Sequence, residues 1–93
     1  MFDVNEYFDG KVKSLAFNDN SDKATIGIMA MGEYEFGTSS IEHMTLISGE
    51  MSVKLPDEEN WRNITINETF VVAANTSFLV KINRDSAYLC LYK

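Results

Sequence analysis

Apolar and polar residues alternate in short runs along this chain, and each run ends at residues that favour turns. In residues 23–31, for example, Ala24, Ile26 and Ile28 fall on one face of an extended chain, and Thr25 and Gly27 fall on the other. No segment sustains the 3.6-residue periodicity of a helix. The pattern predicts an all-β fold of about nine strands, with the turn spacing of a sandwich or barrel.

The expected strands are residues 11–17, 23–31, 33–36, 42–48, 51–55, 61–66, 69–72, 77–82 and 87–92. Gly49-Glu50 is expected to form a tight hairpin, because glycine adopts positive φ angles without steric cost. The polar residues 18–22 and 83–86 are expected to form two further turns. Residues 1–10 are expected to form a short strand or an arm that crosses to a partner. Together these elements predict a closed or nearly closed β-barrel.

A chain of 93 residues is expected to form a single domain, residues 1–93. A domain of this size buries somewhat more than ~60% of the surface that its unfolded chain exposes. Pairing with a second copy would extend the core, so we expect an oligomer, specifically a homodimer.

The charge and cysteine content narrow the classes of partner and the compartment. A net charge of −6 argues against binding to nucleic acid, although eight Lys and Arg residues can still supply a local phosphate pocket. The N-terminus is acidic and the apolar stretches are short, so neither a signal peptide nor a membrane span is expected. Cys90 is the single cysteine and cannot form an intrachain disulfide, which favours the reducing cytoplasm.

One histidine and one cysteine are too few for a zinc site or for an iron site with two histidines and a carboxylate. No metal site is therefore expected. His43 is interpreted as a surface or edge histidine. Cys90 has no neighbouring base in the sequence and is interpreted as a small buried hydrophobe.

Residues 33–55 carry the most specific pattern: a strand, a loop of small residues, Glu42, a second strand, a glycine and a third strand. This layout resembles the first signature of cupin barrels, in which two inward histidines precede a glutamate and a glycine follows. Glu42 and Gly49 have the expected spacing, with six residues between them. At the four metal-ligand positions of the two cupin signatures this chain has Phe36, Thr38, Glu42 and Phe78. The resemblance implies a single-domain, cupin-like (jelly-roll) β-barrel with a metal-free, aromatic-floored pocket and one inward carboxylate.

Such a pocket suits a nucleoside. Phe36 and Phe78 would offer ring faces to a planar base, a contact worth about 1–3 kcal/mol in single-stranded nucleic-acid binding. Glu42 would accept two hydrogen bonds from paired sugar hydroxyls. The plainer interpretation is that both rings fill the barrel and that Glu42 is an exposed residue at a strand start.

Five segments, in collinear order over almost the whole chain, resemble the small cupin family of pyrimidine/purine nucleoside phosphorylases. They are NEYFDGKVKSLAF at 5–17, IGIMAMGEYEFGT at 26–38, EHMTLISGEMSVKLP at 42–56, a strand at Trp61, and SAYLCLYK at 86–93. The resemblance implies a metal-independent, broad-specificity nucleoside phosphorylase, a pentosyltransferase. It would convert a purine or pyrimidine nucleoside and phosphate into the free base and α-D-ribose 1-phosphate. No cofactor is implied, and orthophosphate is a co-substrate.

Glu42 is the expected catalytic residue. The expected contacts to the nucleoside are Tyr34, Phe36, Thr38, Phe78 and Tyr88. The expected contacts to phosphate are Ser39 and either Lys13 or Lys54. For each of the lysines, tyrosines and loop hydroxyls, the plainer interpretation is a solvated face, packing or turn chemistry.

Two alternatives to the enzyme stay open. One is a non-catalytic, metal-free cupin that binds a nucleobase-like small molecule, and the other is a structural dimer with a filled barrel. Ala73-Ala74-Asn75 and Leu91 depart from the residues that the family resemblance leads us to expect, and these departures favour the binding protein.

Overall fold

A computed structural model describes residues 2–20 and 22–93. The regular secondary structure of these residues consists of β-strands alone. The strands are β1 (Val4–Tyr7), β2 (Val12–Asp19), β3 (Asp22–Met29), β4 (Gly32–Gly37), β5 (Glu42–Lys54), β6 (Arg62–Ile64), β7 (Thr69–Val72) and β8 (Ser77–Tyr92). The all-β prediction is confirmed, and residues 4–7 form a strand paired with β2. The predicted turn at 18–22 reduces to a connection around Asn20, and Ser21 within it lies outside the described residues.

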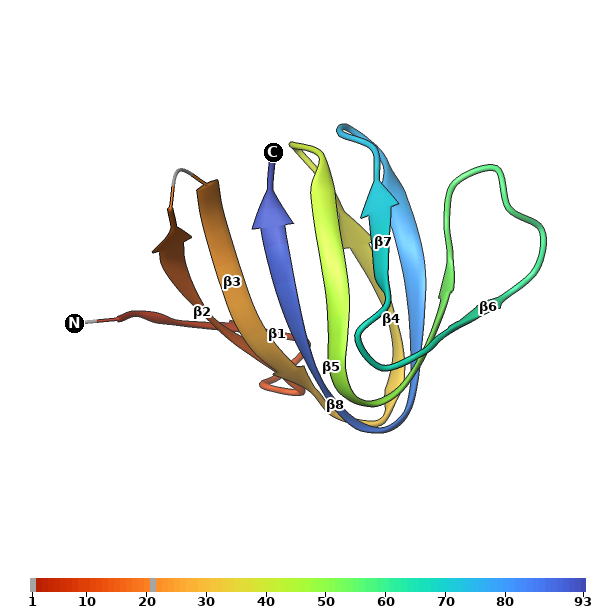
Figure 1. The fold of residues 1–93 in the computed structure, drawn as a ribbon. Helices are drawn as coiled ribbons and strands as arrows, with labels where there is room; N and C mark the ends of the chain where they lie inside the picture. The colour runs from red at the N-terminus through yellow and green to blue at the C-terminus, as the bar shows by residue number, and fades with distance from the viewer. Residues whose placement is uncertain (1, 21) are drawn as a thin grey trace.

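All strand pairs are antiparallel and belong to one sheet of order β1-β2-β3-β8-β5-β6. The long strands β5 and β8 pair with each other and bend at the bottom of the view in Figure 1. On one side of the bend, β4 pairs with the first half of β8, and β6 pairs with the second half of β5. On the other side, β7 pairs with the first half of β5, and β3 pairs with the second half of β8.

The bend divides the sheet into two parts. The first half-sheet contains β1, β2, β3, β7, residues 42–48 of β5 and residues 86–92 of β8, and the second contains β4, β6 and the rest of β5 and β8. One cluster of buried side chains joins them, with Val12 and Met29 from the first half-sheet and Val53 and Val80 from the second. Within the described residues, β1 and β6, the two ends of the strand order, do not pair with each other. The sheet is therefore open, and the predicted closure into a barrel is not found.

The predicted hairpin at Gly49-Glu50 and the predicted turn at 83–86 are both wrong. Each segment is a bend inside a continuous strand, where the β5–β8 register shifts at three places between Leu46 and Met51. Such bulges bend a strand without ending it. Gly49 has φ +104°, and the neighbouring Glu50 N–H donates a hydrogen bond to Ser86 Oγ at 3.0 Å. The glycine therefore lies at a corner of the sheet, where the strand bends.

The outer face of the first half-sheet is apolar as well. Val4 faces Leu15 on β2, Leu15 faces Ile26 on β3, and Ile26 faces Leu89 on β8. Three of these four side chains, together with Ile28, remain 40–59% exposed. We call Val4, Leu15, Ile26, Ile28 and Leu89 the outer apolar row. Within the described residues, the chain forms no helix of the length and apolarity needed to cross a membrane.

Candidate functional site

A cavity of about 280 Å³ is walled mainly by side chains of the first half-sheet and of β4. Six aromatic residues line it: Tyr7, Phe8, Phe36, Phe78, Tyr88 and Tyr92. Four residues with polar groups also line it: Ser14, Glu35, Glu42 and Cys90. A larger hollow of about 480 Å³ lies on the outer apolar row, where aliphatic side chains, Lys11, Lys13 and Asp85 line it but no aromatic residue does. Aromatic walls with a few convergent polar groups make the first cavity the candidate site.

Phe36 and Phe78 come together as the sequence predicts. They are opposite each other in the β4–β8 register, with ring centroids 5.8 Å apart and planes inclined by 32°. The ring of Phe8 meets Phe36 edge-on at 5.5 Å and 87°. All three of these rings line the cavity.

Glu42, the first residue of β5, lines the same cavity. Its side chain is partly buried, and the Cys90 thiol donates a hydrogen bond to Oε1 at 3.6 Å. Burial raises the pKa of Glu42 because it penalises the charged form, and the thiol hydrogen bond offsets part of that rise. His43 follows it on β5 but does not line the cavity.

Three alternate residues of β8, Tyr88, Cys90 and Tyr92, line the wall beside Glu42. Burial raises the pKa of Tyr88 and of Cys90 to about 12 each, and it also raises the pKa of Tyr92. The wall is therefore neutral near pH 7 and offers hydroxyl and thiol groups. Of these three, the sequence interpretation named only Tyr88 as a site residue. The two-residue periodicity of a strand would have identified Cys90 and Tyr92 from Tyr88.

Gly27 on β3 makes room for the Tyr88 ring, which lies opposite it in the sheet. A Cβ atom at position 27 would lie 2.6 Å from both Cζ and the hydroxyl oxygen of Tyr88. Since real Cβ atoms do not approach other atoms so closely, a side chain at this position would displace the ring.

Tyr34 and Thr38 are not brought to the cavity. The Tyr34 hydroxyl donates to the Ala30 carbonyl at 2.6 Å, and its ring packs 6.2 Å from Phe36. The Thr38 hydroxyl donates to the Ala73 carbonyl at 2.7 Å. Both hydroxyls are used by the fold, and neither residue lines the cavity.

The residues expected to meet phosphate also lie elsewhere. Lys13 is on the outer face of β2, where its Nζ is 3.4 Å from Glu6 Oε1. Lys54 ends β5 opposite Leu79, and Ser39 is exposed in the loop after β4. No Lys, Arg or His from the described residues lines the cavity.

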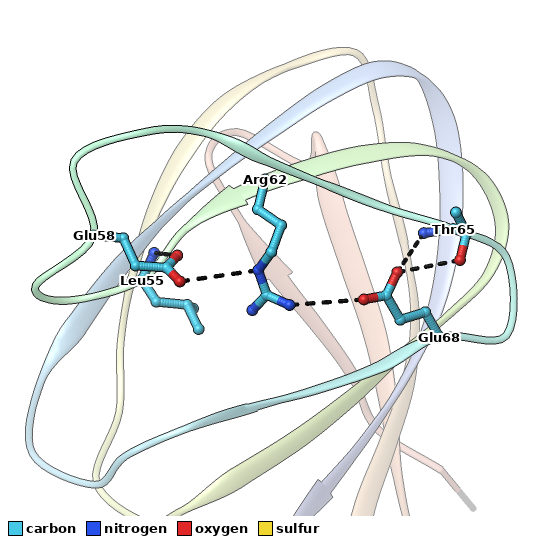
Figure 2. A network of polar contacts seen from close by, with 5 residues as sticks. All are labelled: Leu55, Glu58, Arg62, Thr65 and Glu68. Carbon is cyan, nitrogen blue, oxygen red and sulfur yellow. Dashed lines mark hydrogen bonds and ion pairs between the residues drawn. The ribbon is translucent and has the colours of Figure 1, made fainter.

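Arg62 on β6 belongs to a separate surface network, drawn in Figure 2. Its guanidinium lies between two carboxylates, with Nε 3.9 Å from Glu58 Oε2 and Nη1 3.7 Å from Glu68 Oε2. Glu58 also accepts the Leu55 N–H at 3.1 Å, and Glu68 accepts the Thr65 N–H at 2.8 Å. This arginine connects the loops on either side of β6. Its positive charge is balanced by the two carboxylates that it contacts.

Among residues 2–20 and 22–93, no three or more His, Cys, Asp or Glu side chains are grouped so that they could hold a metal ion. At the cavity itself the side-chain oxygen and sulfur atoms come from hydroxyls, one thiol, the thioethers of Met29 and Met44, and two carboxylates. The chemistry that these groups offer is hydrogen bonding and charge stabilisation.

Comparisons with known proteins agree over the full chain. A family model described as pyrimidine/purine nucleoside phosphorylase matches residues 2–92. A protein of that name from Pseudomonas syringae pv. syringae (strain B728a) is 56% identical over 93 residues, which cover 100% of both chains. A crystal structure of the unknown function protein VPA0057 from Vibrio parahaemolyticus superimposes with a TM-score of 0.95 at 40% identity, covering 100% of this chain and 99% of that one. Hydroxypropylphosphonic acid epoxidase from S. wedmorenis shares the fold alone, with a TM-score of 0.79 and 9% identity over 99% of this chain and 55% of that one.

Proposed function

This chain belongs to the pyrimidine/purine nucleoside phosphorylase family, and we propose on that basis that it is a metal-independent, broad-specificity nucleoside phosphorylase. The observation that carries the proposal is the cavity, which is lined both by the tilted ring pair Phe36 and Phe78 and by the carboxylate of Glu42. An aromatic surface suits the base of a nucleoside, and a carboxylate suits its sugar.

The proposed reaction is a pentosyl transfer to orthophosphate. The glycosidic bond between C1′ and the base nitrogen breaks, and its electron pair leaves with the base. A phosphate oxygen forms the new bond to C1′, and the proton of the phosphate hydroxyl ends on the base nitrogen. Positive charge develops on the sugar in the transition state, as in glycoside hydrolysis.

Glu42 takes the catalytic role in this proposal. Its carboxylate would accept hydrogen bonds from the ribose hydroxyls and stabilise the positive charge on the sugar. Phe36 and Phe78 would hold the base by stacking. Stacking does not depend on the hydrogen-bonding groups of the base, and a stacked base can therefore be either a purine or a pyrimidine.

Orthophosphate would be held by neutral donors. The hydroxyls of Ser14, Tyr88 and Tyr92 line the cavity beside Glu42, whereas Lys13 and Lys54 lie elsewhere. These hydroxyls, and not Lys13 or Lys54, are therefore the proposed contacts to phosphate. The absence of a metal-binding group among the described side chains supports independence from metal.

The architecture and assembly are also part of the proposal. We assign the bent sheet to the cupin-like jelly-roll class, supported by the shared fold with the epoxidase. The outer apolar row supports a homodimer, because a second copy would cover side chains that are now exposed. The free thiol of Cys90 supports a reducing, cytoplasmic location.

The test is phosphate-dependent release of free base from purified protein treated with EDTA. Uridine, inosine and adenosine are each incubated with and without orthophosphate, and base and sugar phosphate are quantified. We expect both products from all three nucleosides, only with phosphate. Release that requires an added metal would contradict metal independence. No release at all would contradict the proposed phosphorylase activity.

A non-catalytic binding protein is the second candidate, because no cation among the described residues lines the cavity to attract phosphate. In that case nucleosides would bind saturably in calorimetry but would stay intact. Binding that phosphate does not affect, together with no product, would favour this candidate.

A further inference from the structure

One oxygen of Glu42 is already occupied by a neighbour. Cys90 lies on the strand adjacent to β5, where it faces Met44, two residues beyond Glu42. Its thiol is 1% exposed and donates to Glu42 Oε1 at 3.6 Å. The contact engages one of the two oxygens of a carboxylate that lines the cavity.

The Cys90 thiol lies beside a second polar pair. Tyr92 is two residues along β8 and lines the same cavity wall. Its hydroxyl is 3.0 Å from Thr25 Oγ1, and either hydroxyl can be the donor of that hydrogen bond. The bond between Cys90 and Glu42 runs from the thiol to the carboxylate.

We propose that Cys90 is a positioning residue: its thiol fixes the Glu42 carboxylate through Oε1 and presents Oε2 to the ligand. The role of this arrangement in catalysis rests on the proposed phosphorylase function. The contact between Cys90 and Glu42 is itself a property of the free protein, since it forms without a ligand.

A thiol suits this position for a physical reason. Burial, and then the charge of Glu42, raise the pKa of Cys90 to about 12, so the donor keeps its proton over the working pH range. A thiol is also a weak donor, so it orients the carboxylate without removing its capacity to accept further hydrogen bonds. The titratable groups around Glu42 are those of Tyr88, Cys90 and Tyr92 on β8, and Glu35 and Tyr7, which line other parts of the cavity.

The test compares Cys90→Ala, which removes the donor, with Cys90→Ser, which keeps one. Val80→Ala is the matched control, because Val80 is fully buried on the same strand but does not line the cavity. The first measurement is the pH titration of the Glu42 carboxyl carbon by NMR, in protein without ligand. We expect its midpoint to move to higher pH in Cys90→Ala, because the charged form loses a donor, and to stay at or below the wild-type value in Cys90→Ser. Val80→Ala should leave it unchanged.

The second measurement is the pH profile of kcat/KM for phosphorolysis. The acidic limb should move in the same direction as the titration, with a loss of about tenfold in Cys90→Ala and recovery in Cys90→Ser. An unchanged Glu42 midpoint in Cys90→Ala would overturn the positioning role. A wild-type protein without activity would overturn the phosphorylase proposal alone, because the NMR titration needs no turnover.

Discussion

At the scale of single residues, Glu42 and His43 are neighbours in the chain but belong to opposite faces of β5, because the side chains of a strand alternate. Only Glu42 lines the cavity. Glu42→Gln should therefore lower kcat/KM by about 100-fold or more, because it removes the charge that stabilises the sugar cation. His43→Gln should stay close to wild type. The measurement is the rate of phosphate-dependent base release, and equal losses in the two variants would place the catalytic group elsewhere.

Glu42→Gln should have the opposite effect on stability. Burial raises the pKa of Glu42 above its ordinary value of 4.5, so the folded state holds this proton more tightly than the unfolded chain does. The charged carboxylate thus costs stability above the folded-state pKa, and this cost vanishes below the unfolded-state pKa. We expect the variant to melt at a higher temperature than wild type near pH 7, and the two melting temperatures to converge below about pH 4. A variant that melts lower near pH 7 would contradict the burial cost.

A substitution at Gly27 tests whether activity requires the observed position of the Tyr88 ring. Gly27→Ala should displace that ring and lower kcat/KM by at least about tenfold, because small misplacements in a site are costly to catalysis. It should also lower the melting temperature. The same substitution in a Tyr88→Ala background should cost little stability, since the clashing ring is gone. Equal stability losses in both backgrounds would show that the glycine serves the β3 backbone instead.

The resemblance to the cupin signatures predicts an inward position for Phe36, Glu42 and Phe78, and all three line the cavity. Tyr88, predicted as a contact to the nucleoside, lines it as well. Thr38 does not line the cavity, and its hydroxyl donates to the Ala73 carbonyl, a backbone contact that the sequence does not reveal. The contact between Cys90 and Glu42 depends on which strands are adjacent, and alternation alone does not determine that.

At the scale of elements, the corner between the two half-sheets decides the fold. Gly49 has φ +104°, and a Cβ there would meet Ser86 Oγ and lie 2.6 Å from the Asp85 carbonyl oxygen. The sequence shows a glycine between two alternating runs, and this pattern is shared by a hairpin and by a bulged bend. The bend became evident only from the pairing of β5 with β8 along both halves. The existence of the strands was predictable, but their continuity was not.

Gly49→Ala should be strongly destabilising. A non-glycine residue at this φ costs about 1–3 kcal/mol, and the contacts with β8 add to that cost. Gly37→Ala is the matched control, because its nearest atom would be the Thr76 carbonyl oxygen at 3.9 Å and its φ is not positive. Urea unfolding followed by tryptophan fluorescence measures both variants. Similar free energies of unfolding for the two would mean that the corner tolerates a side chain.

At the scale of the whole molecule, the first half-sheet is apolar on both faces. Its inner face contributes to the core and to the cavity wall, whereas its outer face carries the outer apolar row. Antiparallel sheets with one solvated face normally show polar residues there. A two-fold contact that placed this row against the same row of a second copy would bury it, because an isologous interface repeats one surface. The ion pair between Lys13 and Glu6 beside the row offers both signs of charge for such a contact.

Ile26→Asp should therefore break the proposed homodimer and leave a monomer of 10.5 kDa. Ile26 lies in the middle of the outer apolar row and is 46% exposed, so a carboxylate there would be tolerated by the isolated fold but not in an apolar interface. Ile66→Asp is the matched control, since Ile66 is a 55% exposed isoleucine between β6 and β7, away from the row. Light scattering after size exclusion measures the mass of each variant, and circular dichroism checks the fold. A wild-type monomer would refute the homodimer, and a folded Ile26→Asp dimer would locate the interface on another face.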